Sequence, residues 1–204
     1  MFISIDGGDG CGKSTQIELL ADWLRQQNRE VFTCRDPGST SLGEAVRGIL
    51  LNRHDLDIFR TSEMLLFMAA RAQMVHELIV PALDSGKIVV TDRFLLSTIV
   101  YQGYAGKIAV SDIETIGRIA TGGVLPDVTF VLDVSLETAK ARMQNREMDR
   151  MERMGQDYHE QVRQGFLTHA KTDLQRFIVL DATQPADVVA TQIREIIAEH
   201  LPPI

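Results

Sequence analysis

Cysteine is scarce in this sequence of 204 residues. Only Cys11 and Cys34 occur, and they form no CxxC pair. A disulfide framework is therefore excluded, and two isolated thiols are typical of a reducing compartment. We expect a cytoplasmic protein.

The chain also lacks an excess of basic charge and a long apolar run. Its 21 Lys and Arg residues stand against 28 Asp and Glu residues, a formal net charge of −7. Nucleic acids and anionic membranes need a broad basic face, so we expect neither as a partner, whereas a small anionic ligand needs only a few cations. No apolar stretch reaches the length of a membrane span, and no basic segment typical of a signal peptide precedes the first predicted strand.

Apolar, β-branched runs alternate with amphipathic stretches. Strands are predicted at 2–5, 31–34, 88–90, 128–134 and 177–181, and helices at 14–27, 41–51, 61–84, 111–121, 135–146, 157–173 and 186–200. This alternation predicts βαβ crossovers, and therefore an α/β fold with a five-stranded parallel sheet covered by helices. Because the composition is 45% apolar and no repeat or linker is visible, residues 1–204 are predicted to form a single domain.

A glycine-rich segment lies between the first predicted strand and the first predicted helix. It reads GGDGCGKST and matches the P-loop pattern from Gly7 to Ser14. Glycines let backbone N–H groups surround an anion, and the helix N-terminus adds partial positive charge. Lys13 can then reach the β- and γ-phosphates, and the Ser14 hydroxyl can ligate Mg²⁺. The alternative is a flexible turn with a chance GKS, but the strand–loop–helix context favours nucleotide binding.

Polar and aromatic residues follow the next predicted strand. Asp36 precedes a Pro-Gly turn, and Ser41 is the expected N-cap of a helix that carries Arg47. Phe67 and Arg71 are four residues apart and share a helix face, where a ring can stack on a base and a guanidinium can bind its edge. The alternative is a core phenylalanine beside a snorkelling arginine.

An acidic and a basic residue follow the strand predicted at 88–90. Asp92 and Arg93 stand at its carboxyl end, where a Walker-B acid would hold Mg²⁺ or its water. A surface ion pair is the alternative. Because ligands collect at the carboxyl ends of parallel strands, we expect both residues near the P-loop. The polar residues that follow at helical spacing are Ser97, Thr98, Tyr101 and Gln102.

The segments GGDGCGKST, RDPGST, FMAAR, DRFLLS and YQG occur in this order. In these motifs and their spacing the chain resembles the thymidylate kinase family of the bacterial type, over essentially its whole length. The resemblance implies a three-layer P-loop NTPase fold, a mobile lid at about 142–155 and a homodimer. It also implies phosphoryl transfer from MgATP to dTMP, giving dTDP and ADP in dTTP biosynthesis.

The resemblance further implies roles for individual residues. Phe67 would stack the thymine, and Arg71 would bind a base oxygen. The implied dTMP-binding residues are Asp36, Arg47, Phe67, Arg71, Arg93, Ser97, Thr98, Tyr101 and Gln102. The implied ATP-binding residues are Gly7, Gly8, Asp9, Gly10, Cys11, Gly12, Lys13, Ser14, Thr15, Arg142, Ala182 and Thr183. The residues implied to hold or place Mg²⁺ are Ser14, Asp92 and Asp9.

Arginines recur through the expected lid. A solvated helix with i,i+4 ion pairs is one interpretation. Because the P-loop contains no arginine, the resemblance instead implies that a lid arginine stabilises the transferring phosphoryl group. Arg146 and Arg150 are the candidates, whereas Arg142 is expected at the adenine, and Arg163 is expected to pair with a lid acid or reach the acceptor. The implied catalytic residues are Lys13, Arg93, Asp9, Arg146 and Arg150.

Two other functions are compatible with a P-loop. The first is a kinase for another nucleotide or for a nucleoside, although a nucleoside brings no phosphate for Arg93 and Arg47. The second is a nucleotide-binding switch with little turnover, against which the chain shows no NKxD-type guanine-reading motif.

Overall fold

The computed structural model describes residues 1–53, 55–143 and 149–201. Five strands form one parallel sheet in the order β2-β3-β1-β4-β5. The strands are β1 (Phe2–Gly7), β2 (Val31–Arg35), β3 (Ile88–Asp92), β4 (Val128–Asp133) and β5 (Phe177–Asp181). The predicted five-stranded parallel sheet is therefore confirmed.

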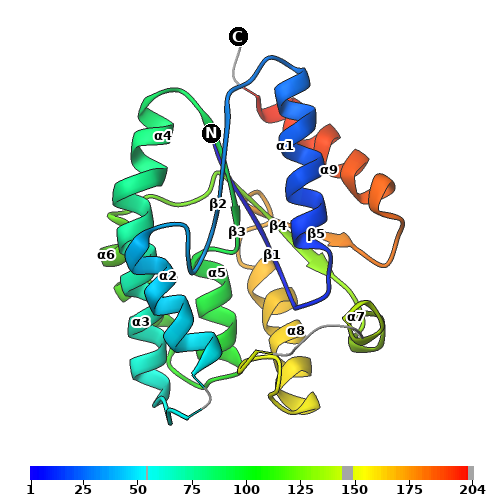
Figure 1. Cartoon of the computed structure of the whole chain (residues 1–204). Helices are drawn as coiled ribbons and strands as arrows, with labels where there is room; N and C mark the ends of the chain where they lie inside the picture. Colours follow the sequence, from blue (N-terminus) through cyan, green and yellow to red (C-terminus); the bar gives the residue numbers. More distant parts are fainter. Residues whose placement is uncertain (54, 144–148, 202–204) are drawn as a thin grey trace.

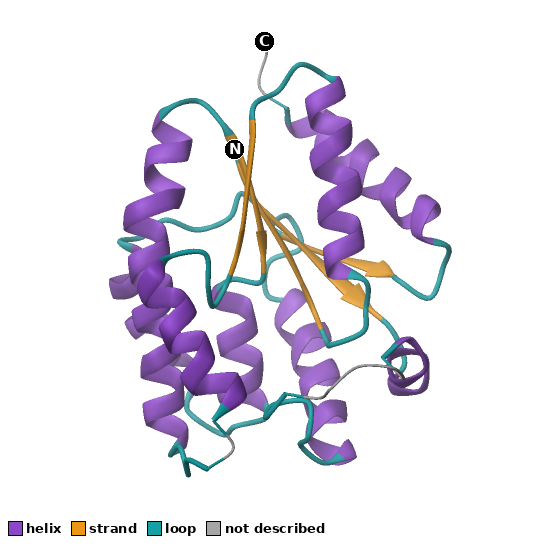
Figure 2. Ribbon diagram, viewed as in Figure 1, coloured by secondary structure: helices purple, strands orange, loops and turns teal. Residues whose placement is uncertain are grey.

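Helices cover both faces of the sheet and complete three layers (Figures 1 and 2). The α-helices are α1 (Lys13–Gln26), α2 (Ser41–Arg47), α3 (Arg60–Met74), α4 (Val80–Asp84), α5 (Leu95–Thr98), α6 (Val110–Thr121), α7 (Leu136–Arg142), α8 (Gln156–Ala170) and α9 (Ala186–His200). Wider, π-helical segments continue some of these helices: η1 (Gly48–Asn52) extends α2, η2 (Val75–Ile79) joins α3 to α4, and η3 (Ile99–Tyr104) extends α5. Helices α1 and α9 pack together on one face, and α3, α6 and α8 lie on the other.

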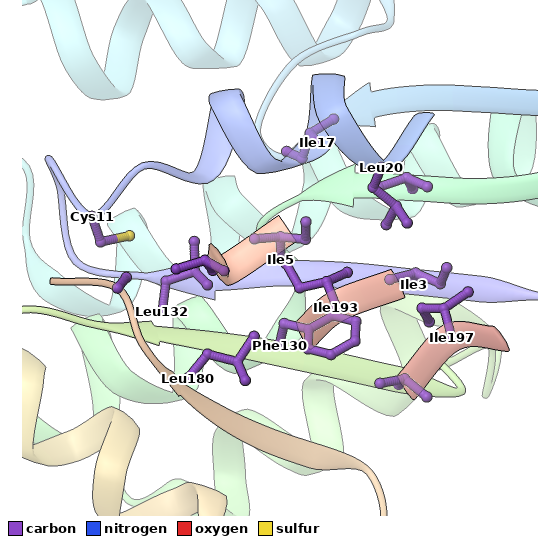
Figure 3. Packing of buried hydrophobic residues seen from close by; sticks show 14 of the residues in the cluster. Ile3, Ile5, Cys11, Ile17, Leu20, Phe130, Leu132, Leu180, Ile193 and Ile197 are labelled. Carbon is purple, nitrogen blue, oxygen red and sulfur yellow. The ribbon is translucent and has the colours of Figure 1, made fainter. Parts of the chain in front are cut away.

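The strands alternate their side chains between two apolar layers. Ile3 and Ile5 of β1 meet Phe130 of β4 beneath α1 and α9, where Leu20 and Ile193 close the layer (Figure 3). The next residues along the strands point to the opposite face, where they pack under the helices of the other layer. Burial on both faces explains why the inner strands β1, β3 and β4 are rich in apolar residues.

The helical run Arg60–Asp84 corrects one expectation. By length and composition it is apolar enough to cross a membrane, although no such stretch was expected from the sequence. In the structure, Met64, Met68 and Met74 of this run are buried in a core cluster with Phe2. Core helices of globular proteins pass the same test, so the run is weak evidence for a membrane span.

Two predicted helix ends also differ from the structure. The N-cap of α2 is Thr40, whose hydroxyl accepts the Gly43 N–H at 2.9 Å, so the expectation of Ser41 is wrong by one residue. Helix α7 ends at Arg142, and residues 144–146 of the helix predicted at 135–146 lie outside the described residues.

Candidate active site

The carboxyl ends of β1, β2 and β3 open into a cavity of about 530 Å³. The parallel register sets Arg35 beside Asp92, and Asp92 beside Ile5, so the loops after these strands converge. The predicted site residues that line the cavity are Asp9, Gly10, Gly12, Lys13, Ser14, Thr15, Asp36, Arg47, Phe67, Arg71, Asp92, Arg93, Ser97, Thr98, Tyr101, Gln102 and Arg142. Those outside its lining are Gly7, Gly8, Cys11, Arg150, Ala182 and Thr183. Arg146 lies outside the described residues.

The P-loop folds as its glycines require. Gly10 and Gly12 have φ values of 74° and 98°, which L side chains rarely adopt. Gly12 is the N-cap of α1, so the unpaired N–H groups of the first turn face the loop. The Lys13 ammonium donates to the Gly8 carbonyl at 2.9 Å and lines the cavity. Cys11 points into the core instead and packs among buried apolar residues.

Arg93 binds the P-loop to the helix that follows β3. Its guanidinium donates to the Gly7 carbonyl at 2.7 Å and to the Asp9 carboxylate at 2.5 Å. The same group donates to the Ser97 hydroxyl at 3.1 Å and lies over the Tyr101 ring, 5.1 Å from its centroid. Arg93 has φ of 67°, the left-handed region, which is uncommon outside glycine. The chain therefore turns sharply here and directs the guanidinium into the cavity.

The charge of Arg93 sets the ionisation of Asp9. Burial alone raises the pKa of this carboxyl group, but the charges of Arg93 and Lys13 and the hydrogen bonds from Arg93 and Tyr101 outweigh it, and the pKa falls from 3.8 to about 2. Burial also raises the pKa of Tyr101 well above its usual value, so the phenol stays neutral.

A buried ion pair lies at the back of the cavity. Arg71 donates from Nε to Asp36 at 2.5 Å, and both side chains are 1% exposed. Arg71 also donates to the Thr98 hydroxyl at 2.8 Å and to the Phe94 carbonyl at 3.3 Å. Burial raises the pKa of Asp36, and the charge of Arg71 opposes that shift. Asp36 therefore holds the arginine in place through Oδ2, while it also lines the cavity.

Glu63 lies outside the cavity lining but contacts a residue of that lining, and sequence reasoning missed it. This buried carboxylate accepts the Gln102 amide N–H at 2.8 Å and forms an ion pair with Arg150. Arg150 also donates to the Leu50 carbonyl at 2.8 Å. A signal was present, because Glu63 precedes Phe67 by four residues and so belongs to the helix face that carries Phe67 and Arg71.

The residues predicted to hold Mg²⁺ differ in their surroundings. Asp92 and Ser14 both line the cavity, and Asp92 Oδ1 is buried with no hydrogen-bond partner in the described part of the chain. Asp9 is instead paired with Arg93. Residues 1–53, 55–143 and 149–201 contain no group of three or more His, Cys, Asp or Glu residues arranged to hold a metal. Mg²⁺ keeps several waters and takes one or two protein ligands with substrate phosphates, so Ser14 and the free oxygen of Asp92 fit it.

Two arginines near β4 and β5 make different contacts. Arg142 donates to the Ala182 carbonyl at 2.9 Å, which brings the end of α7 to the turn that also carries Thr183. Arg163 donates to both carboxylate oxygens of Asp133, at 2.7 and 2.8 Å. Both expectations for Arg163 are therefore wrong, because its bidentate partner is a strand-end carboxylate.

The ion pair between Arg93 and Asp9 should stabilise the fold in a pH-dependent way. The pKa of Asp9 is lower in the folded chain, so its contribution is complete above pH 3.8 and is lost as the pH falls toward 2. Arg93→Gln should lower the free energy of unfolding by about 2 kcal/mol at pH 6, and this deficit should shrink between pH 4 and 2. Urea titrations at several pH values measure it, with the exposed Arg53→Gln as control. A deficit that stays constant from pH 6 to 2 would contradict the prediction.

Comparisons with known proteins identify the family. The thymidylate kinase family model matches residues 5–193. A thymidylate kinase of Thermoanaerobacter sp. (strain X514) is 42% identical over 200 residues, covering 98% of each chain. One of Symbiobacterium thermophilum is 43% identical over 202 residues, covering 99% of this chain and 94% of the relative. The crystal structure of thymidylate kinase from Ehrlichia chaffeensis matches with a TM-score of 0.79 at 34% identity, covering 97% of this chain and 98% of that chain. The chain belongs to the thymidylate kinase family, as its motifs predicted.

Proposed function

We propose that this chain transfers the γ-phosphoryl group of ATP to dTMP, giving dTDP and ADP. One observation carries the proposal: a single cavity joins the P-loop lysine, Lys13, to an aromatic and arginine pocket formed by Phe67 and Arg71. Arg93 lies between the two halves, in contact with Asp9 of the P-loop and Ser97 of the opposite helix. Donor and acceptor sites therefore face each other across one guanidinium.

The reaction needs no nucleophilic side chain. The P-loop N–H groups and Lys13 bind the donor phosphates, while Arg93 and Arg47 bind the acceptor phosphate, a task that suits the planar guanidinium. Catalysis then consists of in-line positioning and of cations placed around the transferring group. Asp9 stays ionised beside Arg93 and orients it.

The acceptor pocket fits a nucleoside with a flat base. Phe67 would stack the thymine, and Arg71 would donate to a base oxygen. Four hydrogen bonds leave one of the five Arg71 N–H groups, on Nη1, for that contact. Thr98 and Gln102 would read the rest of the base edge, and Tyr101 would lie near the sugar.

We also propose Mg²⁺ as the cofactor, held through Ser14 and Asp92 together with the ATP phosphates. The ion would neutralise charge on the phosphates. On the adenine side, the contact between Arg142 and Ala182 supports a base site beside the turn that carries Thr183. Arg150 remains a candidate for the lid arginine, although its present partners are Glu63 and the Leu50 carbonyl.

A homodimer and a cytoplasmic location complete the proposal. Exposed apolar side chains occur on α2, α3 and α6, which pack side by side, and these are Leu42, Leu65 and Ile119. Such a surface suits a second copy of the chain. Cys11 and Cys34 are both free, as a reducing compartment requires. Residues 1–204 would form one domain with a lid at about 142–155, of which residues 144–148 lie outside the described residues.

A substrate panel tests the proposed activity. The purified chain is assayed with ATP and Mg²⁺ against dTMP, dUMP, CMP, GMP and thymidine, with chelated metal as a blank. We expect dTMP to give the highest kcat/KM and thymidine to give no turnover, because the nucleoside carries no phosphate for Arg93 and Arg47. Preference for another acceptor would assign the chain to a different kinase activity. ATP consumption that ignores the acceptor would favour a nucleotide-binding switch.

A further inference from the structure

The amide of Gln102 has a chemically determined orientation. Gln102 lines the acceptor pocket, is 2% exposed, and donates from Nε2 to Glu63 Oε1 at 2.8 Å. A carboxylate only accepts hydrogen bonds, so the amide must present its NH₂ group to Glu63. The carbonyl oxygen of Gln102 has no partner among the described residues and is not enclosed by protein atoms. It is the group that Gln102 offers to a ligand in the cavity.

Glu63 is itself held in place from the other side. Its second oxygen, Oε2, accepts from the Arg150 guanidinium, which also donates to the Leu50 carbonyl at 2.8 Å. The chain of contacts runs from Arg150 through Glu63 to Gln102. Rotation of the Gln102 amide by 180° would bring its carbonyl oxygen against the Glu63 carboxylate, two acceptors in a buried place, which costs free energy. The Gln102 amide is therefore held in the orientation that points its NH₂ group at Glu63.

We propose that Glu63 is a positioning residue that sets base selectivity by fixing the Gln102 carbonyl toward the base. This inference rests on the proposed function. The N3 position of thymine carries an N–H donor, whereas N3 of cytosine is an acceptor. A fixed carbonyl matches the first and opposes the second, and sites with oriented polar groups discriminate strongly against the mismatched partner.

Glu63→Gln tests the inference with a change of only one atom. Arg150 can only donate, so the side-chain carbonyl of the substituted residue must accept its hydrogen bond. The side-chain NH₂ of that residue then faces Gln102. Gln102 must then turn its own carbonyl toward that NH₂ and present its NH₂ to the base. We expect the ratio of kcat/KM for dTMP to kcat/KM for dCMP to fall by about tenfold or more, with dCMP turnover rising in absolute terms. Calorimetric titration of dTMP and dCMP without ATP should show the same shift in Kd.

Three further variants isolate the mechanism. In a Gln102→Leu background, which should itself lower the ratio, Glu63→Gln should change nothing, because Glu63 acts through Gln102. Arg150→Met leaves Glu63 an acceptor only, so it should keep the ratio whatever it does to kcat. Glu77→Gln, an exposed change on the same helical run, should match the wild type.

The outcomes separate this inference from the proposed function. In one outcome the wild type prefers dTMP while Glu63→Gln leaves the ratio of kcat/KM for dTMP to kcat/KM for dCMP unchanged within about twofold. That result would overturn the positioning role alone. An equal effect of Glu63→Gln with and without Gln102 would do the same. Absence of any wild-type dTMP preference would overturn both. If Glu63→Gln does not fold, an unchanged ratio in Gln102→Leu still excludes an oriented carbonyl.

Discussion

Replacement of Lys13 by methionine is expected to lower kcat by about a thousandfold or more, with the protein still folded. The Lys13 side chain is buried along its stem and reaches the Gly8 carbonyl only through its ammonium group. In the reaction that ammonium group would exchange the carbonyl for phosphate oxygens, on which negative charge develops. Methionine keeps the apolar stem and removes the charge, so the P-loop packing stays and the electrostatic stabilisation is lost.

Steady-state kinetics with saturating ATP and dTMP measure this effect, and circular dichroism with a thermal melt shows whether the fold is kept. Lys171→Met is the matched control, because Lys171 is exposed at the end of α8 and should retain wild-type kcat. A Lys13→Met enzyme with kcat within about tenfold of the wild type would exclude the phosphate role of this lysine.

The inner strands of the sheet could be predicted from sequence because they are short, largely apolar and buried. β1, for example, is buried along its whole length, and Phe2, Ile3 and Ile5 supply its apolar side chains just before the P-loop glycines. Helix ends were predicted less well. Thr40 caps α2 because its hydroxyl accepts the Gly43 N–H. Ser41 is adjacent and also carries a hydroxyl, so the sequence alone does not indicate which of the two is the N-cap.

The composition of the site could be predicted, but its internal pairing could not. The P-loop and the Asp92–Arg93 segment are local patterns, so their placement at the strand ends followed from the alternation of strands and helices. The partners are distant in sequence: Asp9 and Arg93 are 84 positions apart, and Glu63 and Gln102 are 39 apart. No periodicity encodes such pairs, because the sheet order and the helix packing bring them together. The sequence placed Asp36 at the substrate, and Asp36 does line the cavity, but its pairing with Arg71 could not be predicted.

Asp36→Asn is expected to lower the free energy of unfolding by about 3–5 kcal/mol, because it leaves the Arg71 guanidinium buried without a counter-charge. Both side chains are 1% exposed, so water cannot replace the lost carboxylate. Arg71 would also lose the anchor that directs it toward the base, so the KM for dTMP should rise. Urea unfolding at pH 7 measures the first effect, and initial rates across dTMP concentrations measure the second.

Two comparisons test whether the buried charge causes this loss. Glu44→Gln removes an acid that faces Arg35 in an exposed pair, and it should cost far less than Asp36→Asn. In the double variant Asp36→Asn, Arg71→Met the unpaired charge is gone, so much of the lost stability should return although dTMP binding does not. A double variant less stable than Asp36→Asn alone would show that Arg71 stabilises the fold through its packing against Met68 and Phe94 rather than through its charge. Comparison of the double variant with Asp36→Asn therefore separates the cost of an unpaired cation from the loss of its side-chain contacts.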